Sequence, residues 1–410
     1  MSESSTEAIA VTEQERRNAL ARGGPSIDWQ GEPHLGSYYG QPEIDAVVDC
    51  IKRSMAYNEG FGFITDDILD FEAEFAEYIG TEYAVSINGA GSGLDMVMMC
   101  LDLQPDDEVI VPALNFRAAP LSVLGQGAKL VLCDCDPRTL QADPADVERR
   151  ITENTRAIYP VHMNGLSAPM DDLAEVAGRH KHHREGEIRL ITDAARALGG
   201  GYKGEKIGKH GWMTVFSFHT MKNMTTLGEG GAVVTDDEQA HEMLRGIRQF
   251  GNETSGWGTN YKMTRVQAAV GSVQLKKLDE MIDGRRRLAA RRTEMLADNP
   301  YLITPYEPED CRHSYYLYTL LVPEDWAGEK RDNLMELLAE EYRVNTVVAN
   351  PPVTRIKGLL GEATSGQEVP VSEELGNRLL CAPIHPKMPD ADNRYICAAL
   401  WEAADRIAKS

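Results

Sequence analysis

Between residues 83 and 192, short apolar segments alternate with segments of helical periodicity, and this alternation restricts the fold more than any other feature of the chain. The apolar segments have the length and composition of buried strands, and we expect strands at residues 83–87, 108–112, 129–133, 157–161 and 188–192. Between them, apolar residues at helical spacing predict helices over residues 92–103, 118–124 and 170–177. Such alternation is typical of a mostly parallel sheet with helices on both faces, so we predict an α/β fold.

The length of 410 residues exceeds the roughly 250–300 residues at which a single hydrophobic core stops growing. We therefore expect a large domain over residues 31–284 and a smaller C-terminal α/β domain over residues 285–410. Residues 1–30 are polar, and we expect them to form a loose N-terminal arm. Two pairs, Ser92 with Asp95 and Thr264 with Gln267, have the spacing of a helix-capping box and predict helix starts.

Acidic residues outnumber basic ones by 64 to 42, which gives a formal net charge of −22 at pH 7. A surface of this charge repels a phosphate backbone, so we expect no nucleic-acid partner. No apolar run is long enough to span a membrane, and the N-terminus has no secretory apolar segment. The seven cysteines fit neither a disulfide framework nor a zinc site, and Cys133 and Cys135 end an expected strand as core thiols. These features predict a cytoplasmic protein with no membrane contact.

Four chemically distinct features follow the expected strands, at the edge where parallel sheets bind ligands. The stretch Asn88–Gly93 opens a helix and predicts an anion site, although a plain tight turn explains it equally well. Asp193 ends a strand, where it suits either a helix cap or the nitrogen of a protonated heteroaromatic ring. Phe116 is either a residue of the hydrophobic core or a ring that stacks on a flat ligand. Lys222 is either a surface charge or an amine that forms an imine. Together they match pyridoxal 5′-phosphate (PLP), which needs an anion cradle, a carboxylate, a stacking ring and an amine.

Lys222 lies in SFHTMKNMTTLGEGG (217–231), and this motif closely resembles one in the DegT/DnrJ/EryC1/StrS family of sugar aminotransferases. The other stretches that carry the resemblance are LQPDDEVIVPALNF (103–116), YPVHMNG (159–165), ITDAARALGG (191–200) and GTNYKMTRVQAAVGSVQL (258–275). Similarity runs from YYGQPEIDAV near residue 38 to RLLCAPIHP near residue 386, over nearly the whole chain. The resemblance implies PLP fold type I, with a mostly parallel seven-stranded sheet in the large domain, and a PLP-dependent aminotransferase.

The resemblance also implies roles for residues that match the family's motifs. Lys222 matches the lysine that forms the internal aldimine with PLP, Asp193 the carboxylate beside the pyridine nitrogen, and Phe116 the stacking ring. The residues that match the family's phosphate site are Ala90, Gly91, Ser92, Ser217 and Asn260. Because the family's counterpart of Asn260 reaches the phosphate of the neighbouring subunit, the resemblance implies a homodimer whose subunits share each active site.

Three positions depart from the family's pattern and bear on the substrate. Gly91 replaces a threonine of the phosphate loop, and Ser92 would supply the missing hydroxyl. Arg196 stands where Gln or His is usual, near the phenolic oxygen of the cofactor. As a fixed cation it would favour the ionised phenolate, or it would reach toward the substrate. Lys262 replaces an arginine, so the two parallel hydrogen bonds that an arginine can donate are lost. We keep Lys262 as a candidate for binding the substrate.

Single histidines supply further candidates around the site. We expect His162 either under the cofactor ring or in support of Asp193, with a satisfied core histidine as an equal alternative. His219 lies three residues before Lys222 and is expected to line the pocket. Candidates for the substrate pocket also include His313, Tyr315 and Tyr316, with strand packing as an equal alternative.

A cluster of three histidines, His180, His182 and His183, lies in GRHKHHREGE. Its spacing resembles that of a metal site. Because its neighbours are charged, we expect instead a solvated loop and no metal.

The site and the resemblance together predict transfer of an amino group from an amino acid, glutamate or glutamine, to a keto-sugar or keto-cyclitol. The product would serve secondary-metabolite or glycan biosynthesis. Two half-reactions through one site predict ping-pong kinetics. Other PLP reactions on this fold stay open, namely a dehydratase, a lyase or a bond-forming reaction, although dehydrating relatives replace the lysine with histidine. A non-catalytic PLP-binding regulator is an alternative of a different class, and no basic helix-turn-helix segment supports it.

Overall fold

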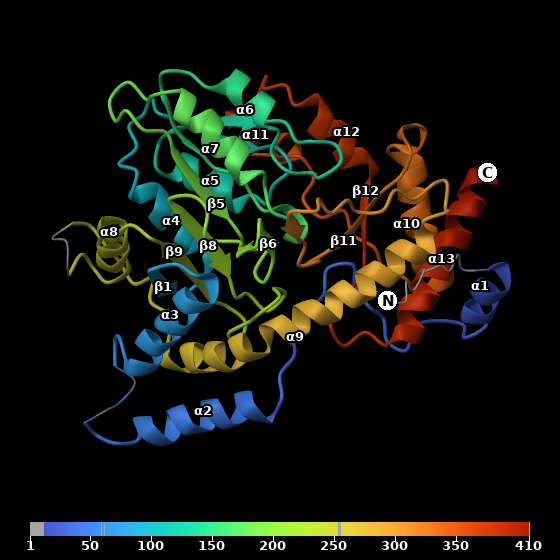
Figure 1. Ribbon diagram of the computed structural model, residues 1–410, viewed down its shortest axis with the longest axis horizontal. Coiled ribbons are helices and arrows are strands. Elements are labelled where there is room, and N and C mark those ends of the chain that lie inside the picture. The colour runs from blue at the N-terminus through green and yellow to red at the C-terminus, as the bar shows by residue number, and fades with distance from the viewer. Residues whose placement is uncertain (1–11, 59, 61, 253–255, 410) are drawn as a thin grey trace, which may run out of the picture.

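The computed structural model describes residues 12–58, 60, 62–252 and 256–409, and its largest element is a seven-stranded sheet (Figure 1). The strands are β1 (Tyr83–Ile87), β2 (Glu108–Pro112), β3 (Lys129–Cys133), β4 (Thr155–Ile158), β5 (Arg189–Asp193), β8 (Met213–Ser217) and β9 (Gly231–Thr235), in the order β1-β9-β8-β5-β4-β2-β3. Every neighbouring pair from β8 to β3 is parallel, and β9 is antiparallel to both β1 and β8. The prediction of a mostly parallel seven-stranded sheet is therefore confirmed.

Helices cover both faces of this sheet. They are α3 (Asp66–Ile79), α4 (Ala90–Met99), α5 (Ala118–Gly125), α6 (Pro144–Arg150), α7 (Met170–Arg179), α8 (Glu238–Arg248) and α9 (Arg265–Leu296). Helices α4, α5 and α8 pack on one face, where they meet Val85, Val111 and Val233. Helices α3, α6, α7 and the first half of α9 pack on the other face. Because both faces are covered, the strands are buried along almost their whole length, as in other parallel sheets.

Only one of the two expected capping pairs caps a helix. At the start of α9, Thr264 Oγ1 accepts from the Gln267 N–H at 3.4 Å, and Gln267 Oε1 accepts from the Thr264 N–H at 2.9 Å. The prediction that Ser92 and Asp95 cap a helix is wrong, because α4 begins at Ala90 and has Gly89 as its N-cap. Glycine has no side chain to accept a hydrogen bond, so the N-terminus of α4 has no side-chain cap.

The C-terminal part is built around the second half of α9. Its sheet is the antiparallel pair β11 (Tyr318–Leu321) and β12 (Leu379–Ala382), and α10 (Glu329–Tyr342) and α13 (Asp390–Lys409) share a separate core with it. The expected boundary at residue 285 falls inside α9, which continues from one core into the other (Figure 1). The remaining elements are α2 (Gln41–Ser54), β6 (Gly201–Tyr202), β7 (Glu205–Lys206), β10 (Cys311–Arg312), α11 (Leu359–Ala363) and α12 (Pro370–Arg378). Among the described helices, none has both the length and the apolar character that crossing a bilayer requires.

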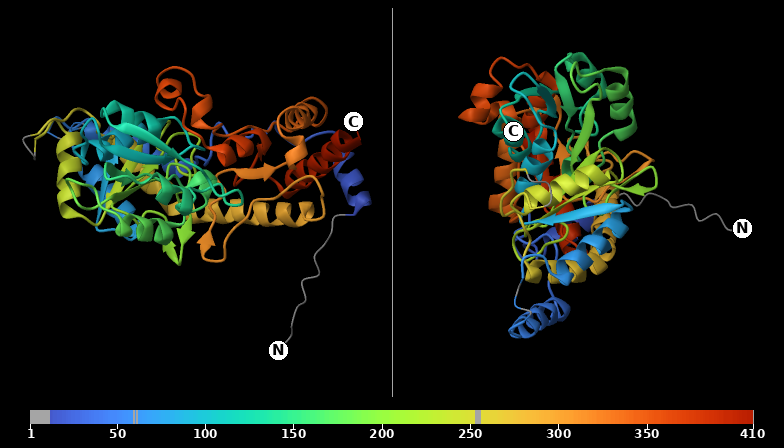
Figure 2. Two further views of the ribbon diagram at one scale, coloured as in Figure 1. Left: turned by 90° about the horizontal axis from the view of Figure 1, so that it is seen from above. Right: turned by 90° about the vertical axis from the view of Figure 1, so that its left-hand side faces the viewer.

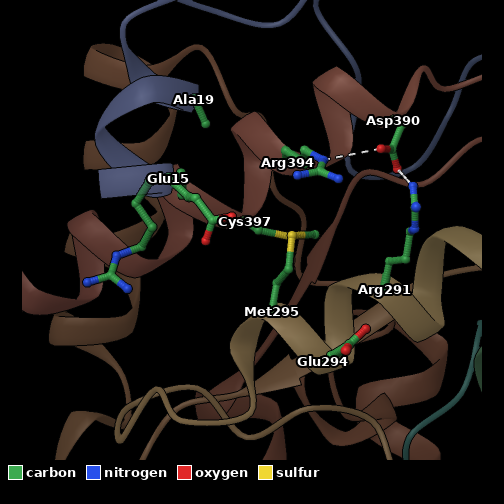
Figure 3. Close-up of a pocket in the computed structure, with 10 residues that line it drawn as sticks. Glu15, Ala19, Arg291, Glu294, Met295, Asp390, Arg394 and Cys397 are labelled. Carbon is green, nitrogen blue, oxygen red and sulfur yellow. Dashed lines mark hydrogen bonds and ion pairs between the residues drawn. The ribbon is translucent and has the colours of Figure 1, made fainter. Parts of the chain in front are cut away.

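The N-terminal segment is not a loose arm where the structure describes it. Helix α1 (Glu13–Leu20) lies along α13 (Figure 2), and the Arg16 guanidinium sits 4.3 Å from the ring centroid of Trp401. A small pocket remains between α1, α9 and α13 (Figure 3), where Asp390 pairs with Arg291 and Arg394. Residues 1–11 of the expected arm lie outside the described residues. The expectation is wrong for residues 12–30, because this polar segment finds partners on α13 that the sequence alone does not reveal.

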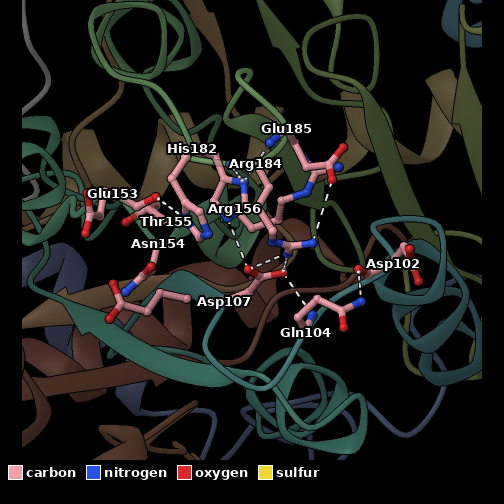
Figure 4. A network of polar contacts seen from close by, with 12 residues as sticks. Asp102, Gln104, Asp107, Glu153, Asn154, Thr155, Arg156, His182, Arg184 and Glu185 are labelled. Carbon is pink, nitrogen blue, oxygen red and sulfur yellow. Dashed lines mark hydrogen bonds and ion pairs between the residues drawn. The ribbon is translucent and has the colours of Figure 1, made fainter.

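The expectation of a solvated histidine loop holds for His183, which is exposed, but is wrong for His182. His182 is 2% exposed, and its Nε2 lies 3.1 Å from Asp107 Oδ1 (Figure 4). Arg184 Nη2 bonds both oxygens of Asp107, at 2.7 and 2.6 Å. His182 is thus buried against a carboxylate, whereas His183 lies at the surface. In the described part of the chain, no group of three His, Cys, Asp or Glu side chains is arranged to hold a metal ion.

Candidate active site

A cavity of about 460 Å³ opens at the carboxyl ends of the sheet strands. Its walls come from the segments that follow β1, β2, β5 and β8, together with residues from the N-terminal segment and the C-terminal part. The sequence-predicted residues that line it are Ala90, Gly91, Phe116, Asp193, Arg196, Ser217, His219 and Lys222. The structure therefore brings together groups that lie more than a hundred positions apart in the sequence.

Lys222 lies in the turn after β8, and its amine faces this cavity. The Nζ atom is 3.2 Å from the hydroxyl of Tyr316 and 4.6 Å from the centroid of the Tyr316 ring. Burial lowers the pKa of Lys222 to about 7, and Arg196 contributes in the same direction, while Glu32 and Asp193 oppose the shift. An amine with this pKa is substantially uncharged near neutral pH and is therefore available as a nucleophile.

Asp193 ends β5 at the bottom of the same cavity, and its Oδ1 accepts from the Ala195 N–H at 2.8 Å. Burial raises the pKa of Asp193, and that hydrogen bond, Lys222 and Arg196 all oppose the increase. A cationic ligand nitrogen at this carboxylate would further favour its ionised form. Asp193 is thus placed to pair with a protonated ring nitrogen.

His162 lies behind Asp193 and does not line the cavity. Its backbone N–H donates to the Asp193 carbonyl at 2.9 Å, and its Nδ1 accepts from the Ala168 N–H at 3.0 Å. Burial lowers the pKa of His162 to about 3, so the ring is neutral and carries its proton on Nε2. The Nε2 atom has no hydrogen-bond partner in the described part of the chain. His162 therefore supports the backbone at Asp193 from behind.

The N-terminus of α4 faces the cavity through Ala90 and Gly91. Strand β9 passes so close to it that a Cβ on Gly231 would lie 2.9 Å from the Ala90 nitrogen. Ser217 at the end of β8 lines the same cavity, whereas Ser92 does not, because its Oγ bonds Asn88 Oδ1 at 2.6 Å. The expectation that Ser92 replaces the missing threonine hydroxyl therefore has no support in its geometry. N–H groups without a side-chain cap at the positive end of a helix form a site for an anion such as phosphate.

Arg196 is held at the cavity wall as a fixed cation. Its Nη1 donates to Asn164 Oδ1 at 3.2 Å, and its Nη2 donates to Asn350 Oδ1 at 2.9 Å. Its Nη2 also lies 3.6 Å from Glu32 Oε1. These contacts fix the guanidinium between the sheet and the C-terminal part, in the same cavity as Lys222.

Asn115 shows that the cavity has room for a polar ligand. It lines the cavity and is 1% exposed, yet neither its amide nitrogen nor its amide oxygen has a partner in the described part of the chain. Buried amides are almost always hydrogen-bonded, because an unpaired one destabilises the fold by about 1–3 kcal/mol. A ligand that bonds to this amide would satisfy it, next to Phe116.

Residues 43–401 match the sequence profile of the DegT/DnrJ/EryC1/StrS aminotransferase family. The chain belongs to this family. It is 34% identical to the dTDP-3-amino-3,4,6-trideoxy-alpha-D-glucose transaminase of Streptomyces venezuelae, with 89% of this chain and 93% of that one covered. It is 33% identical to the GDP-perosamine synthase of Caulobacter vibrioides, with 87% and 94% covered. The solved structure of S. venezuelae DesV in complex with a ketimine intermediate has a TM-score of 0.81 to it at 32% identity, with 89% and 94% covered.

The family assignment confirms that the protein is an aminotransferase with the PLP fold type I architecture, as the sequence predicted.

Other predicted residues of this aminotransferase lie away from the cavity. Asn260 is exposed on the surface. The Lys262 Nζ sits 4.6 Å from the Phe250 ring centroid and has no hydrogen-bond partner in the described part of the chain. His313 is a buried residue that stacks on Tyr315 at 4.0 Å, and burial lowers its pKa to about 3. Neither Lys262 nor His313 contributes to the wall around Lys222.

Sequence reasoning missed some of the cavity's polar groups: Glu32, Asn115 and Asn350. Asn115 could have been found, because it directly precedes Phe116 in a motif that carries the family resemblance. Glu32 gives no signal, since it is one acidic residue in a polar segment. For Tyr316, whose hydroxyl contacts the Lys222 amine, the sequence left a place in the substrate pocket and strand packing equally open.

Proposed function

We propose that this aminotransferase uses PLP to move an amino group from glutamate or glutamine to a keto-sugar or keto-cyclitol. The observation that supports PLP most directly is the meeting of the Lys222 amine and the Asp193 carboxylate in one cavity, beside a helix N-terminus without a side-chain cap. Two relatives carry dTDP-linked and GDP-linked compounds in their names, which supports a sugar-like acceptor.

The residues of the cavity fit this cofactor. The N–H groups of Ala90 and Gly91 and the hydroxyl of Ser217 would hold its phosphate, Asp193 would face its ring nitrogen, and Phe116 would stack on its ring. The unpaired amide of Asn115 is a further polar group that the ligand would satisfy. When bound, the cofactor supplies an electron sink that stabilises negative charge on the carbon that carries the donor's amino group.

Lys222 holds and moves the proton in this proposal. When a donor is bound, the neutral amine of Lys222 would accept the proton from the donor's Cα and would release it again later in the reaction. A pKa of about 7 suits a general base near neutral pH. Because the same amine serves both half-reactions, the donor product must leave before the acceptor enters, which gives ping-pong kinetics.

We further propose that two copies of the chain share each active site. Helix α2 and its C-cap residue turn a stripe of apolar side chains to solvent, and these are 41–79% exposed: Ile44, Val48, Ile51 and Met55. Their spacing places them on one helical face, and an exposed apolar stripe of this kind marks an interface. Asn260 gives separate support for a second copy. It is exposed outside the cavity of its own chain, as we expect of a residue that contributes to the cavity of a partner.

Residues 31–284 and 285–410 would act as large and small domains with the site at their junction. Tyr316 and Asn350 from the C-terminal part meet Lys222 and Arg196 from the sheet part, which supports this division. All seven cysteines are free, which agrees with a reducing cytoplasm.

The test is the absorption spectrum of the purified protein with PLP, before and after addition of glutamate or glutamine. We expect a visible band from the lysine-linked cofactor that disappears when the donor is added. Lys222→Ala should lack the band, and Lys276→Ala is the matched control, because that lysine is exposed on α9. A band that no amino donor discharges would indicate a lyase or bond-forming PLP reaction instead. A protein that binds no PLP would refute the proposal.

A further inference from the structure

The segment before α2 is packed tightly between the C-terminal part and the turn after β8. A Cβ on Gly31 would lie 2.7 Å from the Val347 nitrogen, and a Cβ on Gly36 would overlap the carbonyl oxygen of Met221. Close backbone contact on both sides of the segment therefore fixes the position of Glu32, which lines the cavity.

Glu32 and Tyr316 form a hydrogen-bonded chain that ends at Lys222. The Tyr316 hydroxyl bonds Glu32 Oε1, and the Lys222 Nζ lies 3.2 Å from the same hydroxyl oxygen. Burial raises the pKa of Glu32, but Arg196 and the hydrogen bond from Tyr316 lower it, and the net shift is downward. Glu32 is therefore a carboxylate at neutral pH and can only accept hydrogen bonds. Tyr316 must donate to it, so the tyrosine oxygen accepts from the Lys222 amine.

We propose that Glu32 and Tyr316 are positioning residues for Lys222: they hold one N–H of its amine and leave the lone pair of the neutral amine facing the cavity. The inference rests on the proposed function, because the direction of a lone pair matters only to an amine that attacks a carbon or takes a proton. Without this contact the amine would rotate at the end of a flexible four-carbon stem, and misorientation of a reacting group slows a reaction strongly. Neither residue needs to touch the substrate to have this effect.

The charged groups around the Lys222 amine set its pKa, so the effect of Glu32 on the amine can be measured. The titratable groups that face it or line its cavity are Glu32, Asp193, Arg196, His219, Glu229 and Tyr316. Burial and Arg196 lower the pKa of Lys222, and Glu32 and Asp193 raise it. Loss of the Glu32 charge therefore lowers the pKa of Lys222 further and increases the fraction of neutral amine at a fixed pH.

The chain contains a matched control outside the cavity. The Tyr315 hydroxyl donates to Glu307 Oε2 at 3.0 Å, and Arg286 Nη1 bonds Glu307 Oε1 at 2.7 Å. This group has the same three residue types as Tyr316, Glu32 and Arg196, but none of its members lines the cavity around Lys222.

The test follows acetylation of Lys222 by acetic anhydride as the pH is varied, in the full-length protein without cofactor. Mass spectrometry of the peptide that contains Lys222 reads the extent of reaction. We expect Glu32→Gln to lower the pKa of Lys222 by about one unit and to raise its acetylation rate at about pH 5 by about tenfold. Glu307→Gln should leave the profile unchanged, because its charge lies outside the cavity.

Kinetics of the PLP-loaded enzyme give the second readout. Tyr316→Phe should lower kcat by about tenfold or more while the KM for the amino donor stays within about twofold, because orientation is lost and binding is not. Adding Glu32→Gln to Tyr316→Phe should lower kcat no further, since Glu32 acts through Tyr316. Tyr315→Phe should keep the kcat of the unchanged protein.

An unshifted acetylation profile in Glu32→Gln, or effects on kcat that multiply in the double variant, would overturn the proposal. If Tyr316→Phe fails to fold, the acetylation profile of Glu32→Gln decides alone. A protein that transfers amino groups but shows no shift refutes the positioning role only. A protein that shows the shift but binds no PLP refutes the proposed function and leaves the hydrogen-bonded chain standing.

Discussion

The guanidinium of Arg196 donates a 2.9 Å hydrogen bond to the side-chain oxygen of Asn350 and so joins the sheet part to the C-terminal part beside Lys222. A buried arginine at this place adds a permanent positive charge to a cavity that already holds an amine. The two cations repel each other, and the amine is the one that can give up its proton.

Replacing this charge should make Lys222 harder to deprotonate. Arg196 lowers the pKa of Lys222, so Arg196→Gln should raise it by about one unit. The rate at which added PLP forms its visible band should then reach its plateau about one pH unit higher. Arg312→Gln is the control, because Arg312 pairs with Asp283 at the surface. An unchanged pH profile in Arg196→Gln would show that the arginine does not set the charge state of the amine.

The phosphate site should not tolerate a side chain on β9. A Cβ on Gly231 would lie 2.7 Å from the Phe216 carbonyl oxygen and 2.9 Å from the Ala90 nitrogen, so Gly231→Ala must displace the start of α4. We expect at least about a tenfold loss of affinity for PLP, read by titration of the visible band. Gly178→Ala is the control, since a Cβ there meets nothing within 4 Å. Equal affinities in the two variants would argue against phosphate binding at this helix end.

Acid should destabilise the protein partly through His313. Burial lowers the pKa of His313 to about 3 in the folded state, against about 6.5 when unfolded. The unfolded state therefore binds the extra proton between these values, and stability falls as the pH drops below 6.5. Between pH 7 and pH 5, urea unfolding of His313→Gln should lose about 2 kcal/mol less than that of the unchanged protein.

The exposed residue His183 provides the control for this measurement. His183→Gln should lose as much stability between pH 7 and pH 5 as the unchanged protein. Parallel pH dependence in all three proteins would mean that His313 is accessible to protons in the folded state.

A charge on the outer face of α2 should separate the proposed dimer. Ile51 is 48% exposed in the middle of the apolar stripe, so Ile51→Glu would place a carboxylate in the interface. Sedimentation velocity should show a monomer for this variant and a dimer for Ile303→Glu, whose site lies in the C-terminal part.

Mixed Lys222→Ala and Asn260→Ala proteins should regain activity that neither has alone, and no recovery would contradict a shared site.

The anchor of the N-terminal segment should influence the site from a distance. Asp392 accepts hydrogen bonds from the Ser26 N–H at 3.0 Å and from Trp29 Nε1 at 2.8 Å. We expect Asp392→Ala to speed amide hydrogen exchange over residues 22–32 and to lower kcat as Glu32→Gln does, because both remove Glu32 from its place. Glu402→Ala on the exposed side of α13 should change neither quantity. Faster exchange without a loss of kcat would show that Glu32 holds its place without the anchor.

The alternation of strands and helices was enough to predict a mostly parallel sheet, because the hydrophobic period of each segment is a local property of the sequence. The number of seven strands came from the family resemblance. The residues that follow the strands were enough to predict the core of the site, because parallel strands bring their carboxyl ends to one edge. Asp193 and Lys222 were found in this way, and the structure places both in one cavity.

What the sequence could not reveal depends on contacts between distant segments. Glu32 and Tyr316 meet only because the N-terminal segment crosses between the two parts of the fold, and no periodicity records such a crossing. His182 was misjudged for the same reason, since its partner Asp107 lies 75 positions away. The cap at Ser92 failed on a local point, because Gly89 allows α4 to begin earlier.

The anchor on α13 also has a consequence for the order of events during synthesis. Trp29 and Asp392 are separated by 363 positions, so the segment with Glu32 leaves the ribosome long before the helix that receives it exists. The sheet and the turn with Lys222 are translated in the interval. A chain that ends before α13 therefore carries Lys222 without the anchor of the N-terminal segment, so the proposed orientation of its amine would be completed only after α13 has been made.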